Sequence, residues 1–298
     1  MNAGARLLEL ARTSGAQSIA VVGTSKNAGK SADVAAICAA LRQEGTLFGL
    51  CSAGRDGETY DVIDGGPKPR FFLYARTLLA TAEVLLGAGA ALEIVEETGE
   101  RGALGPIVVA RVSGAGYFEI AGPSSARALD RIARSLARRA EFVVIDGAID
   151  RLAALRERGD AIVVAVGATA PTQSAAVDEI RALVERLRLP EPEADRAALR
   201  IEGGLTATHA ERLAREGERR QVVVGDPTQI AFGGKTFLSL ASRLVLRCER
   251  PLKPVACTVA PSGPEGRYDA KGFLRAVAAA TGLPTFDVFA GEEITSAG

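Results

Sequence analysis

The chain of 298 residues lacks several features on which common functional classes depend. It has no Trp and a single His, and no two of its four cysteines have the C-x-x-C spacing of a zinc or dithiol redox site. Because soft metal ligands are this scarce, neither kind of site is expected. The sequence instead predicts that the cysteines are small buried residues of a protein kept in a reducing compartment. They are Cys38, Cys51, Cys248 and Cys257.

An excess of either charge is also missing. Lys and Arg number 36, Asp and Glu number 36, and the formal net charge is zero. A nucleic-acid-binding protein normally has a basic surplus or a basic stripe, so no nucleic-acid partner is predicted. Since the chain has no polybasic run, attachment to an anionic membrane surface is not predicted either.

Long apolar runs are absent as well. The longest, from Leu78 to Leu92, is interrupted by Glu83 and is too short to span a bilayer. The amino-terminal segment has scattered charges and no apolar core of signal-peptide length. The sequence therefore predicts no membrane span and a cytoplasmic protein.

Short apolar runs alternate with amphipathic stretches, which predicts an α/β fold with a mostly parallel sheet flanked by helices. The predicted strands are 18–22, 47–52, 92–95, 107–112, 117–120, 142–145, 161–166, 199–201, 221–224, 255–259 and 285–289. The predicted helices are 7–11, 31–42, 76–86, 124–139, 173–187, 208–216, 235–243 and 270–281. Residues 188–198 are the best linker candidate. We therefore expect one domain over 1–190 and, over 191–298, a continuation of the same sheet or a small second lobe.

The strongest chemical signal is the segment Gly23–Ser31, which reads GTSKNAGKS. A predicted strand ends at Gly23, and Gly29-Lys30-Ser31 opens a predicted helix. Such a phosphate-binding loop (P-loop) wraps backbone N–H groups around a di- or triphosphate, while its Lys reaches the β- and γ-phosphates and its hydroxyl holds Mg²⁺. The predicted nucleotide-binding residues are Gly23, Thr24, Lys26, Asn27, Ala28, Gly29, Lys30 and Ser31. The domain over 1–190 is thus predicted to be the nucleotide-binding domain.

The loop departs from the general pattern G-x-x-x-x-G-K-[ST] at one position, since Thr24 stands where that pattern has Gly. In the longer frame G-T-x-x-x-x-G-K-[ST] the match is complete. This form resembles the loop of the dethiobiotin-synthetase branch of P-loop enzymes. The resemblance implies a P-loop NTPase fold.

Carboxylates for Mg²⁺ are expected at the ends of neighbouring strands. Asp146 directly follows the apolar run FVVI, where a Walker B acid is expected, and Asp56 lies just past the second strand in GRDGE. Both are predicted metal ligands and, with Lys30, catalytic residues. Arg55 and Glu58 of the same segment could contact the substrate or the γ-phosphate.

Other groups give weaker signals. Lys26, inside the loop, could reach a phosphate or a partner's nucleotide. Lys68 and Arg70 flank a proline, which is consistent with an anionic ligand but more typical of a solvated turn. His209 lies on a predicted helix, where an exposed or capping role is favoured. The segment 225–228 has the position of a loop at the carboxyl end of a strand, where ligands gather in open α/β sheets.

Three motifs together, GTSKNAGKS, GRDGE and VVIDGAIDR, resemble the small P-loop subunit of the lysine 5,6-aminomutase reactivase. The likeness is clearest over about residues 17–151 and in TGLPTFDV, and it is weaker over 152–280. It implies ATP binding and hydrolysis coupled to repair or release of damaged cofactor in a cobalamin-dependent aminomutase. The implied partners are that mutase or a second reactivase subunit, and dimers are common in this branch, so a homodimer or heterodimer is plausible.

Two alternatives stay open. A ligase of dethiobiotin-synthetase type would act on a small carboxylate or amine, but such enzymes carry a Lys shortly after the second strand, and here the next Lys is Lys68. A nucleotide-dependent scaffold would use the same loop to switch conformation without a small-molecule substrate. The chain has no base-reading N-K-x-D motif, so ATP rather than GTP is implied by the resemblance alone.

Overall fold

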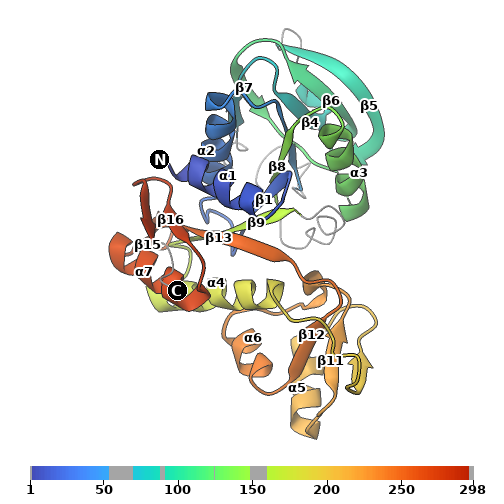
Figure 1. Ribbon diagram of the computed structural model, residues 1–298, viewed down its shortest axis with the longest axis vertical. Coiled ribbons are helices and arrows are strands. Elements are labelled where there is room, and N and C mark those ends of the chain that lie inside the picture. Colours follow the sequence, from blue (N-terminus) through green and yellow to red (C-terminus); the bar gives the residue numbers. More distant parts are fainter. Residues whose placement is uncertain (1, 54–69, 88–90, 124, 148–159, 295–298) are drawn as a thin grey trace. The chain divides into compact units, whose positions relative to one another are not determined.

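The computed structural model describes residues 2–53, 70–87, 91–123, 125–147 and 160–294. The chain divides into two compact units (Figure 1). The first comprises Met1–Val22 and Lys30–Val163, and the second comprises Gly23–Gly29 and Val164–Gly298. The main division therefore falls at 163/164, whereas the composition of the predicted linker places it at 190/191.

The first unit is built on a mostly parallel sheet in which the strands follow the order β1-β8-β2-β4-β6-β5. The first four of these run parallel, and β6 and β5 add antiparallel strands at one edge. A separate antiparallel ribbon joins β3 to β7. All residues of β1, β2 and β4 are buried, as expected for strands covered on both faces. The strands are β1 (Ser18–Gly23), β2 (Phe48–Ser52), β3 (Arg70–Leu73), β4 (Leu78–Ala82), β5 (Leu92–Gly102), β6 (Gly105–Val112), β7 (Gly116–Glu119) and β8 (Phe142–Asp146).

Helices cover both faces of this sheet, with α1 (Ala3–Thr13) and α2 (Lys30–Gln43) on one side and α3 (Ala126–Ala137) on the other (Figure 1). These helices pack closely on one another and on the sheet. A Cβ on Gly4 of α1 would lie 2.1 Å from the carbonyl oxygen of Ala36, so α1 and α2 touch backbone to backbone. On the other face, a Cβ on Gly49 would lie 3.0 Å from Leu136 of α3. Small residues thus let α1 pack closely on α2, and α3 pack closely on β2.

The segment 76–86, predicted as a helix, is instead β4 followed by the 3-10 helix η1 (Glu83–Leu85). β4 pairs in parallel with β2 and antiparallel with β6. The helical prediction was wrong because a short run that is apolar throughout has no period of its own, and five fully buried residues fit a central strand. Each of the other predicted elements has a counterpart, although β5 is much longer than predicted.

In the second unit, β16 pairs in parallel with β13 and antiparallel with β17, and β10, β11 and β12 form a separate parallel sheet. That small sheet has its own apolar core, which includes Leu205, Val222, Phe237 and Leu246. The strands are β9 (Ala161–Gly167, which begins in the first unit), β10 (Ala198–Arg200), β11 (Gln221–Val224), β12 (Val245–Cys248), β13 (Lys253–Ala260), β14 (Ser262–Gly263), β15 (Gly266–Arg267), β16 (Thr285–Asp287) and β17 (Glu292–Ile294). The helices are α4 (Gln173–Leu187), α5 (Ala207–Glu216), the 3-10 helix η3 (Pro227–Gln229), α6 (Gly234–Ala241) and α7 (Ala270–Thr281).

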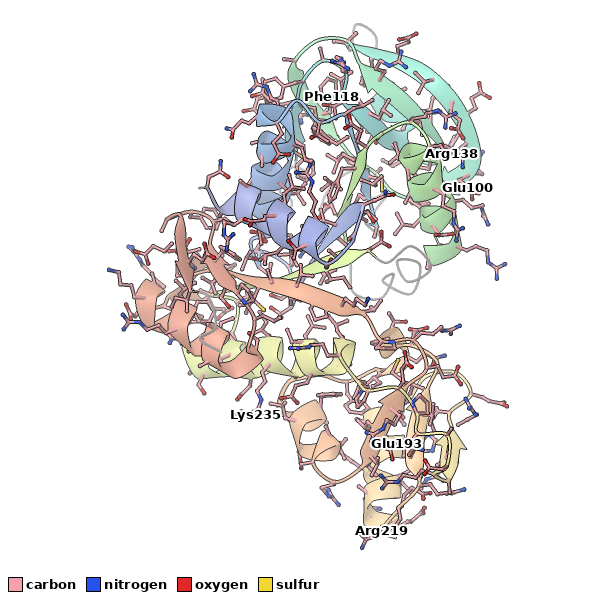
Figure 2. All side chains as sticks on the ribbon, in the orientation of Figure 1. Glu100, Phe118, Arg138, Glu193, Arg219 and Lys235 are labelled. Atoms are coloured by element: carbon pink, nitrogen blue, oxygen red, sulfur yellow. The ribbon has the colours of Figure 1, made fainter. Side chains whose placement is uncertain are left out.

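The described fold is therefore α/β, with mostly parallel strands flanked by helices, as the sequence predicts. Charged side chains, Glu100 and Glu193 among them, extend from the ribbon (Figure 2). Glu100 of β5 pairs with Arg131 of α3 (Nη2 to Oε2, 2.9 Å), and Glu193 pairs with Arg247 (Oε1 to Nη2, 2.5 Å). Exposed pairs of this kind contribute little stability one by one. Across the described ranges, no helix has both the length and the apolar character needed to cross a bilayer.

Candidate functional site

The loop that follows β1 has an unusual backbone. Asn27 has φ +60° and Gly29 has φ +103°, whereas non-glycine residues rarely adopt positive φ. Backbones that alternate right- and left-handed conformations form concave nests of N–H groups that bind anions. Within the described part of the chain, the amides of Asn27, Ala28 and Gly29 donate no hydrogen bond. Three successive donors are therefore left for a ligand.

Contacts within the second unit hold this loop in shape. The amide of Thr24 donates to the carbonyl oxygen of Ala165 of β9 (3.0 Å), and the hydroxyls of Ser25 and Thr169 lie 2.6 Å apart. A Cβ on Gly167 would lie 2.8 Å from the carbonyl oxygen of Asn27, so only glycine lets the loop pack this closely on the end of β9. The loop is thus preorganised by the protein.

At position 24 this loop has a threonine hydroxyl where the general phosphate-loop pattern has glycine, and the hydroxyl makes no hydrogen bond within the described part of the chain. Thr24 Oγ1 is buried and has no hydrogen-bond partner among the described residues. A buried hydroxyl without a partner costs free energy, so such an atom is uncommon unless a ligand or water completes it. The position that breaks the general pattern therefore belongs to the same candidate site.

Lys30 and Ser31 form the first turn of α2, where the unpaired N–H groups and the helix dipole favour an anion. Ser31 is exposed, and Lys30 is partly buried. Burial lowers the pKa of Lys30, while the nearby charges of Asp146 and Asp33 act to raise it. The Lys30 ammonium group and the Ser31 hydroxyl thus follow the loop directly along the chain.

Asp146 ends β8 and lies in register with Val21 of β1 and Ser52 of β2. Its carbonyl oxygen accepts a hydrogen bond from the amide of Ala53 (2.6 Å). Burial raises the pKa of its carboxyl to about 6, and the charge of Lys30 opposes that rise. The first unit therefore brings together the two residues, Lys30 and Asp146, that the sequence assigns to phosphate and metal.

Sequence reasoning missed Asp33, which lies in the first turn of α2 and is completely buried. A carboxylate three residues after the phosphate-loop lysine falls on the same face of a helix as that lysine. This spacing was the available signal. The spacing alone does not single out Asp33, because an acid near a helix start is ordinarily explained by the helix dipole.

Several predicted site residues lie outside the described residues, and the structure adds nothing about them. They are Asp56, Arg55, Glu58 and Lys68. Lys26 is described and exposed.

The weaker candidates make local contacts. Arg70 forms an ion pair with Glu119 across the β3–β7 ribbon (2.7 Å), so its cation is already partnered. The amide of His209 donates to the side chain of Thr206, the N-cap of α5. In the segment 225–228, the Asp226 side chain caps η3. All four cysteines are free and buried, as predicted.

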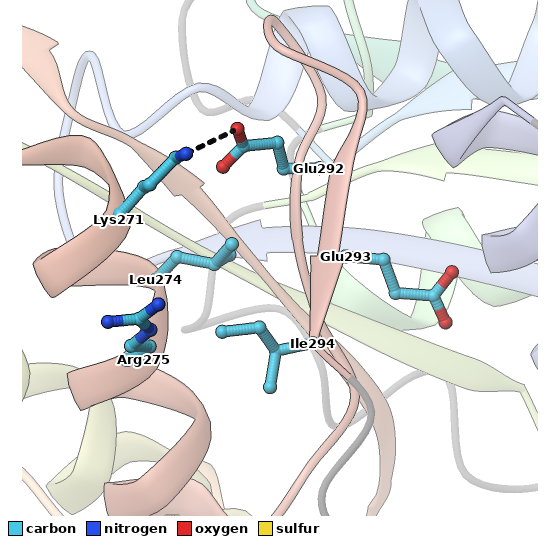
Figure 3. Close-up of a pocket in the computed structure, with 6 residues that line it drawn as sticks. All are labelled: Lys271, Leu274, Arg275, Glu292, Glu293 and Ile294. Carbon is cyan, nitrogen blue, oxygen red and sulfur yellow. Dashed lines mark ion pairs between the residues drawn. The ribbon is translucent and has the colours of Figure 1, made fainter.

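Two other features of the described residues bear on the location of the site. No group of three His, Cys, Asp or Glu side chains there could hold a metal by itself. A pocket beside α7 and β17 is lined by Lys271, Leu274, Arg275, Glu292, Glu293 and Ile294. Figure 3 shows Lys271 paired with Glu292 (4.0 Å) and the Glu293 side chain directed away from α7. Charges of both signs line this pocket, so it has no clear preference for an anion.

Comparison with known proteins found no match: no protein-family model, no curated protein and no solved structure is similar to the chain.

Proposed function

We propose that the protein binds a nucleoside triphosphate with Mg²⁺ on the continuous segment Gly23–Ser31 and hydrolyses it, within a P-loop NTPase fold. One observation supports this most strongly: a loop with three unpaired backbone N–H groups leads directly into a helix whose first residue is Lys30. Such an arrangement is built to hold a chain of phosphates.

The residues present also fit Mg²⁺. This ion is ordinarily held by one or two carboxylates together with substrate phosphates and water, so a cluster of three acids is not required. Ser31 and Asp146 would hold it, with Asp56 as a further predicted ligand. When bound, Mg²⁺ would neutralise negative charge that develops on the phosphates during transfer. The loop amides and the Lys30 ammonium group would stabilise the same charge electrostatically.

Binding of nucleotide to the whole chain tests this proposal. In isothermal titration calorimetry, ATP with Mg²⁺ is expected to bind with a dissociation constant on the order of micromolar, and removal of Mg²⁺ with a chelator is expected to weaken binding. GTP titrated in parallel shows whether the protein prefers guanine or adenine, and we propose that it prefers adenine. Neither heat of binding nor phosphate release with any triphosphate would refute the proposal.

The pH dependence of hydrolysis should follow the carboxyl of Asp146. Its pKa of about 6 means that only about a tenth of the molecules carry the ionised, Mg²⁺-binding form at a pH of about 5. We therefore expect kcat/KM at pH about 5 to be about tenfold below its plateau, and the midpoint to move to lower pH as Mg²⁺ increases, because the metal binds the ionised form. A flat profile, or a midpoint that ignores Mg²⁺, would contradict this assignment.

The raised pKa of the Asp146 carboxyl also affects the free energy of unfolding. The carboxyl of Asp146 has a pKa of about 6 in the folded protein against its ordinary value of 3.8, so the folded state holds its proton more tightly. Stability without nucleotide should therefore fall as the pH rises from about 4 to about 6 through this group. Urea unfolding at these two pH values, compared with the Asp146→Asn variant, measures that contribution.

The close packing of the loop on Gly167 gives a further expectation. In Gly167→Ala, the added Cβ would meet Asn27 O at 2.8 Å and Ala28 Cα at 3.0 Å, so the loop must move. We expect a loss of about 1–3 kcal/mol in stability and at least a tenfold weaker affinity for Mg·ATP. Gly87→Ala is the matched control, because a Cβ there meets nothing within 4 Å. Equal affinities for the two variants would show that the loop conformation is not required.

We propose that ATP hydrolysis by this protein drives the reactivation of a cobalamin-dependent aminomutase. Support comes from the resemblance of GTSKNAGKS, GRDGE and VVIDGAIDR to the small subunit of the lysine 5,6-aminomutase reactivase. Capture of partners from the source organism with the tagged chain, followed by mass spectrometry, tests it. Recovery of an aminomutase or a second reactivase subunit, as a heterodimer, supports this role. Turnover that depends on a small carboxylate or amine, with no protein partner, would favour a ligase instead.

A further inference from the structure

The feature that carries a further inference is the complete burial of Asp33. This carboxylate lies in the first turn of α2 and has no exposed surface. Removing a carboxylate from water is costly unless a cation or several hydrogen bonds compensate it. A buried acid on a phosphate-binding helix therefore has a partner that makes its burial tolerable.

Lys30 supplies a cation within the same helical turn. The two residues are three apart on one helix, so their side chains lie on the same face. The charge of Asp33 acts directly on the Lys30 ammonium group, together with that of Asp146. Two acids therefore act on the charge of Lys30, one from its own helix and one from the end of β8.

The two acids differ in what they can do when nucleotide is bound. The proposed function assigns Asp146 to Mg²⁺, and a carboxylate that coordinates a metal attracts the ammonium group less. Asp33 has no exposed surface, and the proposed function gives it no contact with the metal. It is thus the acid that can continue to orient Lys30 in the loaded state.

We propose that Asp33 is a positioning residue, which fixes the Lys30 side chain so that its ammonium group meets the β- and γ-phosphates. This inference rests on the proposed function, because it gives Lys30 the role of a phosphate ligand. The competing explanation is that Asp33 only complements the helix dipole. A dipole role would affect stability, whereas a positioning role affects the phosphate that Lys30 contacts.

Asp33→Asn tests the proposal, because the amide keeps the shape of the side chain and removes its charge. We expect the affinity for Mg·ATP to fall about 10- to 100-fold, as for other misplaced catalytic groups. Affinity for ADP should fall several-fold less, since ADP lacks the γ-phosphate. Asp130→Asn is the matched control: Asp130 also belongs to a helical ion pair, with Arg134 at 2.8 Å, and should leave both affinities unchanged. Equal losses for ATP and ADP, or no loss, would overturn the proposal.

A second measurement needs no nucleotide. Unfolding free energies of Lys30→Met, Asp33→Asn and the double variant form a double-mutant cycle, and positioning requires that the two changes be non-additive. Additive effects would show that the two side chains do not interact and would overturn the proposal. If wild-type protein binds no triphosphate, the proposed function fails. If it binds and Asp33→Asn binds equally well, only the role of Asp33 fails.

Discussion

Replacement of Lys30 by Ala is expected to weaken the binding of Mg·ATP at least about 100-fold and to reduce hydrolysis about a thousandfold. The ammonium group is expected to make charged hydrogen bonds to two phosphates, each contributing about 1.5–3 kcal/mol. It is also expected to stabilise charge that develops in the transition state. Calorimetry and a phosphate-release assay measure the two effects.

A second lysine in the chain serves as the matched control. Like Lys30, Lys235 directly follows a glycine at the start of a helix, α6, but its side chain is exposed and lies 3.9 Å from Asp178. Lys235→Ala should bind and hydrolyse nucleotide like the wild type. Retention of micromolar affinity in Lys30→Ala would contradict the assignment of the phosphate loop.

Asp146→Asn is expected to reduce Mg²⁺-dependent hydrolysis about 100-fold or more while leaving some affinity for metal-free nucleotide. An amide is a poorer ligand for Mg²⁺ than a carboxylate, and the loop and Lys30 do not depend on the metal to contact phosphates. Hydrolysis rates over a range of Mg²⁺ concentrations should show a much higher Mg²⁺ requirement in the variant.

The control for this change is Asp287, another acid that ends a buried parallel strand. Its side chain caps the turn after β16 by accepting hydrogen bonds from the amides of Phe289 (2.9 Å) and Ala290 (3.0 Å). An asparagine can accept the same bonds, so Asp287→Asn should keep the wild-type Mg²⁺ dependence. Similar loss in both variants would point to general damage and not to a metal ligand.

The strands that the sequence predicts best are those with a recognisable residue pattern at their ends. β1 runs from a β-branched stretch into Gly23, and β8 is an apolar run closed by Asp146, so local patterns define both. β4 has no such residue pattern at its ends, and its conformation as a strand depends on pairing with β2 and β6. Its neighbours along the chain do not reveal those partners, so the segment 76–86 was predicted as a helix.

The candidate site shows the same limit. Lys30, Ser31 and Asp146 could be predicted, because a phosphate loop and the acid after a neighbouring strand have local signatures. The role of Gly167 could not, since its contact with Asn27 joins residues far apart in the chain. Asp33 lay within reach of a spacing argument, but its complete burial is a property of the packed α2 helix.

The central claim is that the amides of Asn27, Ala28 and Gly29 hold the phosphates. Amide ¹H–¹⁵N spectra of the wild type, recorded with and without Mg²⁺ and a non-hydrolysable ATP analogue, test it most directly. We expect these three amides to move strongly to lower field as they gain charged acceptors, while the paired amides of Val222 and Val223 in the separate small sheet stay in place. Saturation with the analogue that leaves the loop amides unshifted would contradict the claim.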